Sequence, residues 1–178
     1  GELAPTDPCW MVQSGYVRLS CNNDADNSTT LGIWGPGEQV MPALLSINGL
    51  QLIALSPVEL RACEPTPEQE RHCMHLQLQQ LATLLQLARI RRAEQRLFHL
   101  LLWLGERFGQ SSGEGVRLSF NSLHLTHRNL AAITGMTRVT ITKALIRFRQ
   151  EGRLSRQGRE ELLRPAALQA IHAGVGSP

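Results

Sequence analysis

The stretch Leu125–Ile146, LTHRNLAAITGMTRVTITKALI, decides how this chain of 178 residues is interpreted. Thr126 and Thr137 are each placed to cap a helix, because a threonine hydroxyl accepts a hydrogen bond from an unpaired amide in the first turn. Between the two helices, Gly135 provides the permissive backbone that a sharp turn requires. The small and apolar side chains expected to be buried by the two helices are Leu130, Ala131, Ile133, Ile141, Ala144 and Leu145. The stretch therefore predicts a helix-turn-helix.

The outward face of the second predicted helix carries side chains that suit a DNA major groove. Arg138 and Lys143 can donate to O6 and N7 of guanine, and Val139 suits the methyl group of thymine. Thr137, Thr140 and the amides at the start of this helix suit phosphate oxygens. The alternative is an ordinary pair of amphipathic helices with a solvated basic face.

Charge is unevenly distributed along the chain. Residues 1–66 hold two Arg and seven Asp or Glu, a net charge of −5, whereas residues 67–178 hold 16 Arg or Lys and eight Asp or Glu, a net charge of +8. The basic part contains the predicted helix-turn-helix, and a basic domain suits binding to a polyanion.

Length and composition are compatible with one large or two small domains, because domains typically hold about 100–150 residues. With 42% hydrophobic residues the chain can build real cores. No apolar run approaches the roughly 20 residues that span a bilayer, and there is no secretory leader. We therefore expect a soluble, cytoplasmic protein that does not enter a membrane.

No cofactor, metal site or active site is predicted. The cysteines Cys9, Cys21, Cys63 and Cys73 are separated by 12, 42 and 10 residues, which matches no common zinc or iron–sulfur pattern. We expect reduced thiols, with a redox or metal-sensing role as the alternative. His72 and His75 lie one helical turn apart, but no carboxylate stands at a matching spacing. Without a phosphate loop, a nucleophile elbow or paired catalytic carboxylates, the chain is not expected to be an enzyme.

The segment up to about Cys63 is typical of short strands joined by turns. Strands are predicted at residues 10–12, 15–19, 29–34, 50–55 and 58–62. The first two form a strand–turn–strand pattern, and the polar residues 22–28 are expected to form a hairpin loop. A core of about 60 residues is marginal alone, so this sheet domain is expected to pack against the next element.

That element is a helix predicted over residues 68–92. A coiled-coil seam at alternating steps of about three and four residues is formed by Met74, Leu78, Leu81, Leu85 and Ala88. A second apolar stripe is formed by Leu76, Leu84, Leu87 and Ile90. We assign the seam to contact with a second copy of the helix and the other stripe to contact with the strand domain. The alternative is that both stripes face one intramolecular core.

After a break at residues 90–92, another amphipathic helix is predicted, with Leu97, Leu100, Leu101, Leu104 and Phe108 on one face and Gly109 as its cap. Residues 110–115 are expected to form a flexible loop and residues 116–120 a strand. Behind the helix-turn-helix, a hairpin around Gly158 predicts a winged helix, whose wing carries Arg153, Arg156 and Arg159 for phosphate contact or simply for solvation. The fold class is α+β, with domains at 1–65, 66–109 and 110–178.

The chain resembles the regulators of the cyclic-AMP receptor protein and FNR family, nearest to the cyanobacterial nitrogen-control regulators. The resemblance is carried by LTHRNLAAITGMTRVTITKAL (125–145), GYVRLS (15–20), LGIWGPGE (31–38), ALSPVEL (54–60) and the long helix. It implies a two-fold dimer in which a β-roll sensor, here lacking its first strands, is joined by a long dimerisation helix to a winged helix-turn-helix. Such dimers bind half-sites about one helical turn apart and contact RNA polymerase; whether they act as an activator or a repressor depends on where the site lies relative to a promoter.

The resemblance also implies roles for single residues. Arg138 matches the family's guanine-reading arginine, and Lys143 stands where a second base-contacting arginine is usual, so readout there should be weaker. Val139 replaces a glutamate of the cyclic-AMP branch and belongs to the Arg-Val-Thr pattern of the nitrogen-control branch, which favours a GTA-type half-site. Positions at or beside those that hold the DNA backbone are Thr126, His127, Arg128, Thr137 and Thr140.

The sequence identifies no small-molecule effector. Residues 40–55, which correspond to the family's phosphate-binding segment, contain no charged residue, so a bound phosphate there would lack a cationic partner. We therefore expect no dependence on cyclic nucleotides. A 2-oxoglutarate-responsive regulator using Arg89, Arg91 or Arg92 is one alternative, and a dimeric adaptor whose winged helix binds protein is another.

Overall fold

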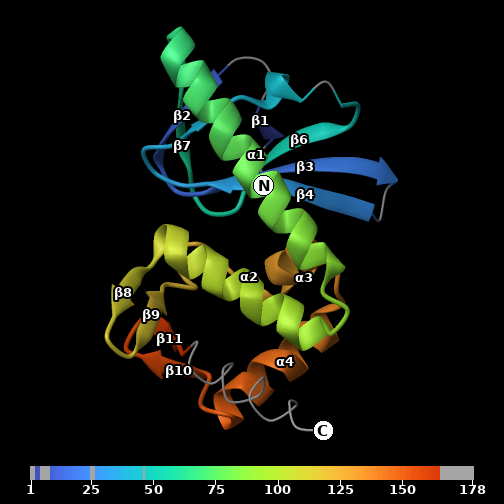
Figure 1. The fold of residues 1–178 in the computed structure, drawn as a ribbon, viewed down its shortest axis with the longest axis vertical. Helices are drawn as coiled ribbons and strands as arrows, with labels where there is room; N and C mark the ends of the chain where they lie inside the picture. Colours follow the sequence, from blue (N-terminus) through green and yellow to red (C-terminus); the bar gives the residue numbers. More distant parts are fainter. Residues whose placement is uncertain (1–2, 5–8, 25–26, 46, 165–178) are drawn as a thin grey trace, which may run out of the picture.

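The computed structural model describes residues 3–4, 9–24, 27–45 and 47–164. An N-terminal β-roll is crossed by one long helix, and three further helices with a small sheet form the C-terminal half (Figure 1). The predicted α+β class is confirmed. Residues 165–178, which end the third predicted domain, lie outside the described part, as do residues 25–26 of the predicted loop 22–28.

The roll consists of two antiparallel sheets. The four-stranded sheet has the order β1 (Leu3–Ala4), β6 (Leu50–Ala54), β3 (Val17–Asp24) and β4 (Asn27–Trp34). The three-stranded sheet has the order β5 (Gln39–Val40), β2 (Cys9–Ser14) and β7 (Glu59–Cys63). The five predicted strands are confirmed, whereas β1 and β5, of two residues each, are too short to show an alternating pattern.

Two details of the roll differ from the prediction. The first two predicted strands, β2 and β3, belong to different sheets and do not pair with each other. The hairpin between β3 and β4 is confirmed, but its strands extend into the predicted loop, where Asn22 is opposite Ser28. Between β5 and β6, a 3-10 turn (Pro42–Leu44) occupies the segment without charged residues.

Helix α1 (Pro67–Arg89) packs against β4 of the roll. Thr66 and Gln69 form a capping box at its start. The buried stripe of α1 is Cys73, Gln77 and Gln80, whereas the leucines predicted to face the strand domain are only half-buried. Gly32 permits the close approach, since a Cβ atom there would lie 2.3 Å from the Trp34 ring and 3.0 Å from Oε1 of Gln80.

Gln80 lies between Leu76 and Leu84 on α1, and this polar residue is buried there because it accepts a hydrogen bond from a backbone amide of the sheet. Its Oε1 accepts a hydrogen bond of 2.7 Å from the amide of Ile33. Gln80→Ala leaves this buried amide without its acceptor, so we expect the free energy of unfolding to fall by about 1–3 kcal/mol in urea denaturation. The exposed Gln86→Ala on the same helix is the control and should change stability by less than about 0.5 kcal/mol. Equal stabilities of the two variants would contradict this role.

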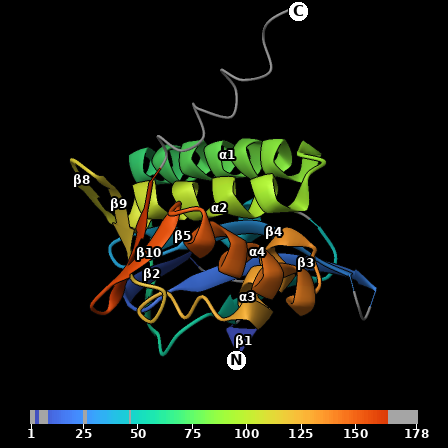
Figure 2. The ribbon, with the colours of Figure 1, turned by 90° about the horizontal axis from the view of Figure 1, so that it is seen from below.

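The C-terminal half is built around α2 (Ala93–Phe108), which follows the predicted break after α1. It packs with α3 (His127–Thr134), α4 (Arg138–Gln150) and a sheet of order β10-β11-β9-β8 (Figure 2). These strands are β8 (Gln110–Ser112), β9 (Gly115–Leu118), β10 (Leu154–Gln157) and β11 (Glu160–Leu163). The predicted flexible loop at 110–115 is therefore wrong: residues 110–112 pair with β9, an interaction that composition does not reveal.

Two arginines of α2 join distant elements: Arg107 contacts the roll, and Arg96 contacts the ends of α1 and α3. Arg107 of α2 donates to the carbonyl oxygen of Ile33 at 2.7 Å and forms a 2.6 Å ion pair with Glu38. Arg96 donates to the carbonyl oxygen of Ile90 at the end of α1 and to that of Thr134 at the end of α3. The Arg107 contacts tie α2 to the roll, and the Arg96 contacts tie the end of α3 to the end of α1.

Candidate nucleic-acid interface

Helices α3 and α4 form the predicted helix-turn-helix. The hydroxyl of Thr126 accepts a hydrogen bond from the amide of Asn129 at 3.1 Å, and that of Thr137 accepts one from the amide of Thr140 at 3.2 Å. Gly135 ends α3 in the left-handed conformation, with φ 67°. Both predicted caps and the predicted turn are confirmed.

The inner faces of these two helices pack against α2. Leu130, Ala131, Ile141, Ala144 and Leu145 are buried as predicted, and Phe148 joins them. Ile133 is only half-buried, because it lies at the edge of a cavity between α3 and α1. This packing leaves the opposite face of α4 uncovered within the described part of the chain.

The uncovered face of α4 holds the three predicted base-contacting residues. Arg138 and Lys143 are exposed, and Val139 has 63% of its surface exposed. Beside them, the Thr142 hydroxyl donates to the carbonyl oxygen of Arg138 and lies 2.8 Å from Nδ1 of His127. The face thus combines two cationic donors with an exposed apolar side chain, as a major-groove reader requires.

The predicted backbone-contacting residues surround this face. Thr126, His127, Arg128 and Thr137 are exposed and Thr140 is half-buried. A hydroxyl that accepts a capping hydrogen bond still has its own hydrogen to donate. Thr126 and Thr137 can therefore cap their helices and donate to a phosphate oxygen at the same time.

The wing carries two exposed arginines, not three. Arg156 and Arg159 are exposed at the hairpin β10–β11. Arg153 is 5% exposed, because its guanidinium lies 3.9 Å above the Phe98 ring and 4.8 Å from that of Phe148. The prediction that Arg153 contacts phosphate is therefore wrong. Its cation is held inside the C-terminal core by aromatic faces.

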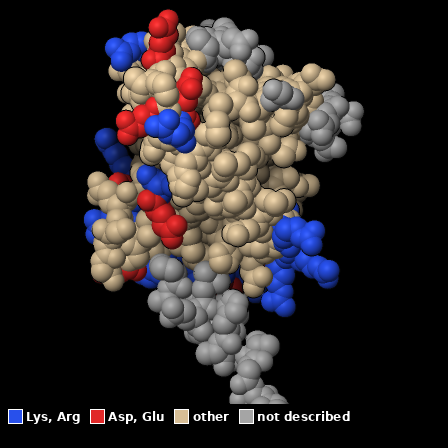
Figure 3. Space-filling view, turned by 45° about the horizontal axis from the view of Figure 1, so that its top comes forward, with Lys and Arg blue, Asp and Glu red and all other residues tan. Residues whose placement is uncertain are grey.

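The predicted dimer seam on α1 is largely uncovered in the single chain. Met74, Leu78 and Leu85 are among its exposed large hydrophobic residues, and Ala88 is also exposed. Leu81 is half-buried against the core of the roll. Residues 72–88 contain no Asp, Glu, Lys or Arg, and Figure 3 shows a broad uncharged surface on the side where α1 lies.

The structure brings together three cysteines that the sequence spacing did not connect. Cys9 and Cys63 are opposite each other on β2 and β7, with 3.2 Å between their sulfur atoms, and Cys73 of α1 donates to Oε1 of Gln39 beside them. Burial and the Cys63 thiol raise the pKa of Cys9 to about 12, which disfavours its thiolate. Only the register of β2 with β7 could have indicated this pair. In the described part of the chain, no group of His, Cys, Asp or Glu is arranged to hold a metal ion.

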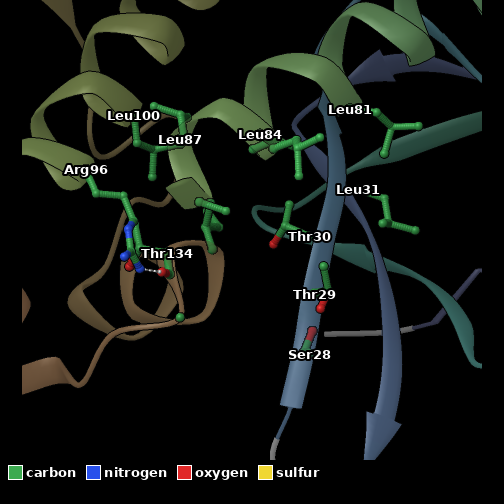
Figure 4. A pocket seen from close by; sticks show the side chains of 14 residues that line it. Ser28, Thr29, Thr30, Leu31, Leu81, Leu84, Leu87, Arg96, Leu100 and Thr134 are labelled. Carbon is green, nitrogen blue, oxygen red and sulfur yellow. Dashed lines mark hydrogen bonds between the residues drawn. The ribbon is translucent and has the colours of Figure 1, made fainter. Parts of the chain in front are cut away.

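One cavity, of about 450 Å³, lies between α1, α2, α3 and β4. Leu81 and Leu84 of α1 and Thr30 and Leu31 of β4 line it, and the guanidinium of Arg96 is turned to Thr134 (Figure 4). A second cavity, of about 1140 Å³, lies between the roll and the start of α3. Arg89, Arg91 and Arg92, considered above for 2-oxoglutarate, line neither of these cavities.

The geometry defines a class of protein: a DNA-binding regulator with a winged helix-turn-helix joined to a β-roll. Residues 95–171 match the Crp-like helix-turn-helix domain. The chain is 37% identical over 155 residues to the regulatory protein CysR of Synechococcus elongatus, covering 87% of this chain and 75% of that protein. The chain belongs to the CRP/FNR family of transcription regulators. The nearer likeness to nitrogen-control regulators stays a prediction.

Solved structures show the same fold. FixK2 from Bradyrhizobium japonicum matches with a TM-score of 0.72 and 19% identity, covering all of this chain and 92% of its own. A CRP/FNR-family regulator from Thermus thermophilus matches with a TM-score of 0.67 and 23% identity, covering 99% of this chain and 96% of its own. None of the helices in the described part has the length and apolarity to cross a bilayer.

Proposed function

We propose that the chain acts as a homodimer that places two copies of α4 in successive major grooves of a pseudo-palindromic site. The observation that carries this proposal is the uncovered face of α4, where Arg138 and Lys143 flank Val139. Arg138 would donate to guanine, Val139 would contact a thymine methyl group, and Lys143 would add a weaker donor. This combination supports the predicted GTA-type half-site.

Phosphate contacts would hold α4 in this orientation. The exposed hydroxyls of Thr126 and Thr137 lie at the starts of α3 and α4, where amide groups also favour anions. His127 and Arg128 extend this contact along α3, and Arg156 and Arg159 of the wing add charge beside the groove. Contacts of this kind set the position on the duplex without reading its sequence.

The dimer would form through the uncovered seam of α1. Met74, Leu78 and Leu85 expose apolar surface at coiled-coil spacing along a stretch without charged residues. Burying this surface against a second copy would stabilise the assembly. By likeness to its family, we further propose that the dimer acts in the cytoplasm and contacts RNA polymerase as an activator, without catalytic activity.

Arg138→Ala is expected to weaken binding to the preferred duplex by about 1–3 kcal/mol and to relax specificity at one base pair. Selection of bound sites from random duplexes, followed by gel retardation at several salt concentrations, measures both effects. Arg61→Ala is the matched control, because Arg61 is an exposed arginine on β7, outside the helix-turn-helix and outside the α1 seam. If Arg138→Ala bound every duplex as the wild type does, the winged helix would be a protein-binding adaptor instead.

A further inference from the structure

Arg18, the second residue of β3, is a buried cation without an anionic partner among the described residues. It is 7% exposed, and its Nη1 lies 3.4 Å from the Thr30 hydroxyl, a long contact. Its Nε has no hydrogen-bond partner in the described part of the chain. Burial lowers the pKa of Arg18, and no carboxylate in the described part of the chain offsets this effect, yet a guanidinium remains charged at neutral pH. A buried charge of this kind ordinarily requires a partner.

Arg18 lines the cavity of about 1140 Å³ between the roll and the start of α3. The segment at the start of α3 contributes His124, Thr126 and Arg128 to its lining, and none of the described residues that line it is Asp or Glu. His124 has φ 50°, the only positive value for a non-glycine residue in the described part. The remaining wall is largely apolar, with Ile53 and Leu55 from the roll. The cavity thus presents cationic and hydroxyl donors on two sides of a partly apolar space.

We propose that this cavity binds a metabolite with a doubly charged oxyanion group, either a phosphate or a sulfate. Arg18 would bind the oxyanion from the roll, and Arg128 and Thr126 would bind it from α3. The planar guanidinium fork matches the oxygens of such a group. The apolar wall would hold the remainder of the ligand.

The ligand would oppose DNA binding, a consequence that rests on the proposed function. Thr126 and Arg128 cannot hold the oxyanion and a DNA phosphate at the same time. Thermodynamic linkage then requires that the ligand lower the affinity for DNA by the same factor as DNA lowers the affinity for the ligand. Binding of the charged metabolite at this site would therefore favour release of the protein from the duplex.

Isothermal titration with inorganic phosphate and with sulfate, in chloride buffer of constant ionic strength, tests the site. We expect saturable binding of at least one of these anions to the wild type, and at least tenfold weaker binding to Arg18→Met. Arg18→Lys keeps the charge and should recover part of the affinity. Arg61→Met is the matched control on the neighbouring sheet, where Arg61 is exposed and outside the cavity. Absence of saturable binding to the wild type, or equal binding by Arg18→Met, would overturn the proposal.

Gel retardation with the same proteins separates a metabolite from a DNA phosphate as the source of the oxyanion. In buffer free of phosphate and sulfate, Arg18→Met should bind the duplex as tightly as the wild type does. The anion that binds should weaken DNA binding by the wild type at least about fivefold and should leave Arg18→Met unaffected. If Arg18→Met instead bound DNA more weakly with a smaller salt dependence, Arg18 would hold a DNA phosphate and the proposal would be wrong. If the wild type bound no duplex in any of these buffers, the proposed function would be wrong, whereas the anion site would be unaffected.

Discussion

Replacing both Leu78 and Leu85 by glutamate is expected to weaken binding to a duplex with two half-sites by about 10²–10⁴-fold. In a dimer, the first α4 that binds brings the second to its half-site, so the second contact is intramolecular. Both leucines are more than 60% exposed in the single chain. Charges at these positions should therefore separate the two copies without disturbing the fold of either.

Two measurements check this result. Sedimentation equilibrium should show a dimer for the wild type and a monomer for the double variant, and gel retardation should show the loss of affinity only on a duplex with both half-sites. Ile47→Glu is the control, since Ile47 is 46% exposed but lies in the roll, outside α1. A double variant that stays dimeric would exclude α1 as the dimer interface.

Phe98→Ala is expected to lower the free energy of unfolding by about 3–5 kcal/mol. Phe98 is completely buried in α2 and forms an edge-to-face contact with Phe148 of α4, with 5.2 Å between ring centres. The guanidinium of Arg153 lies over the same ring. Removing the ring opens a cavity and takes away one of the two aromatic faces that hold this buried cation.

Urea denaturation followed by circular dichroism measures this loss. Phe98→Leu is the matched variant, because it keeps most of the apolar volume and removes only the aromatic face. We expect a smaller loss for leucine than for alanine, and the difference between them separates the cavity from the contact with Arg153. A loss below about 1 kcal/mol for Phe98→Ala would mean that the surrounding helices close the cavity.

The helix-turn-helix could be predicted from the chain because its signals are local. Thr126, Gly135 and Thr137 act on amides within three residues or on their own backbone, so short-range spacing is enough to place both helices. The break after α1 and the wing hairpin follow in the same way from neighbouring residues. The strands of the roll could be predicted from their residue types and from the turns that bound them, although their pairing could not.

Burial of polar residues, in contrast, depended on distant parts of the chain. The type and position of Arg153 predict a wing residue that contacts phosphate, yet α2 supplies an aromatic ring that covers its guanidinium. Gln80 interrupts an apolar stripe, and its burial is explained by the hydrogen bond that it accepts from the amide of Ile33. In both cases the partner lies on an element more than 40 residues away.

Helix positions, the turn and the outward face of α4 thus follow from residues that are neighbours in the chain, because caps, glycine conformations and helical periodicity act over one or two turns. The pairing of Cys9 with Cys63, the burial of Arg18 and the cavity between the roll and α3 follow only from the folded chain. A side chain's partners and solvation depend on which distant part of the chain covers it, and the spacing of residues along the sequence does not predict that contact.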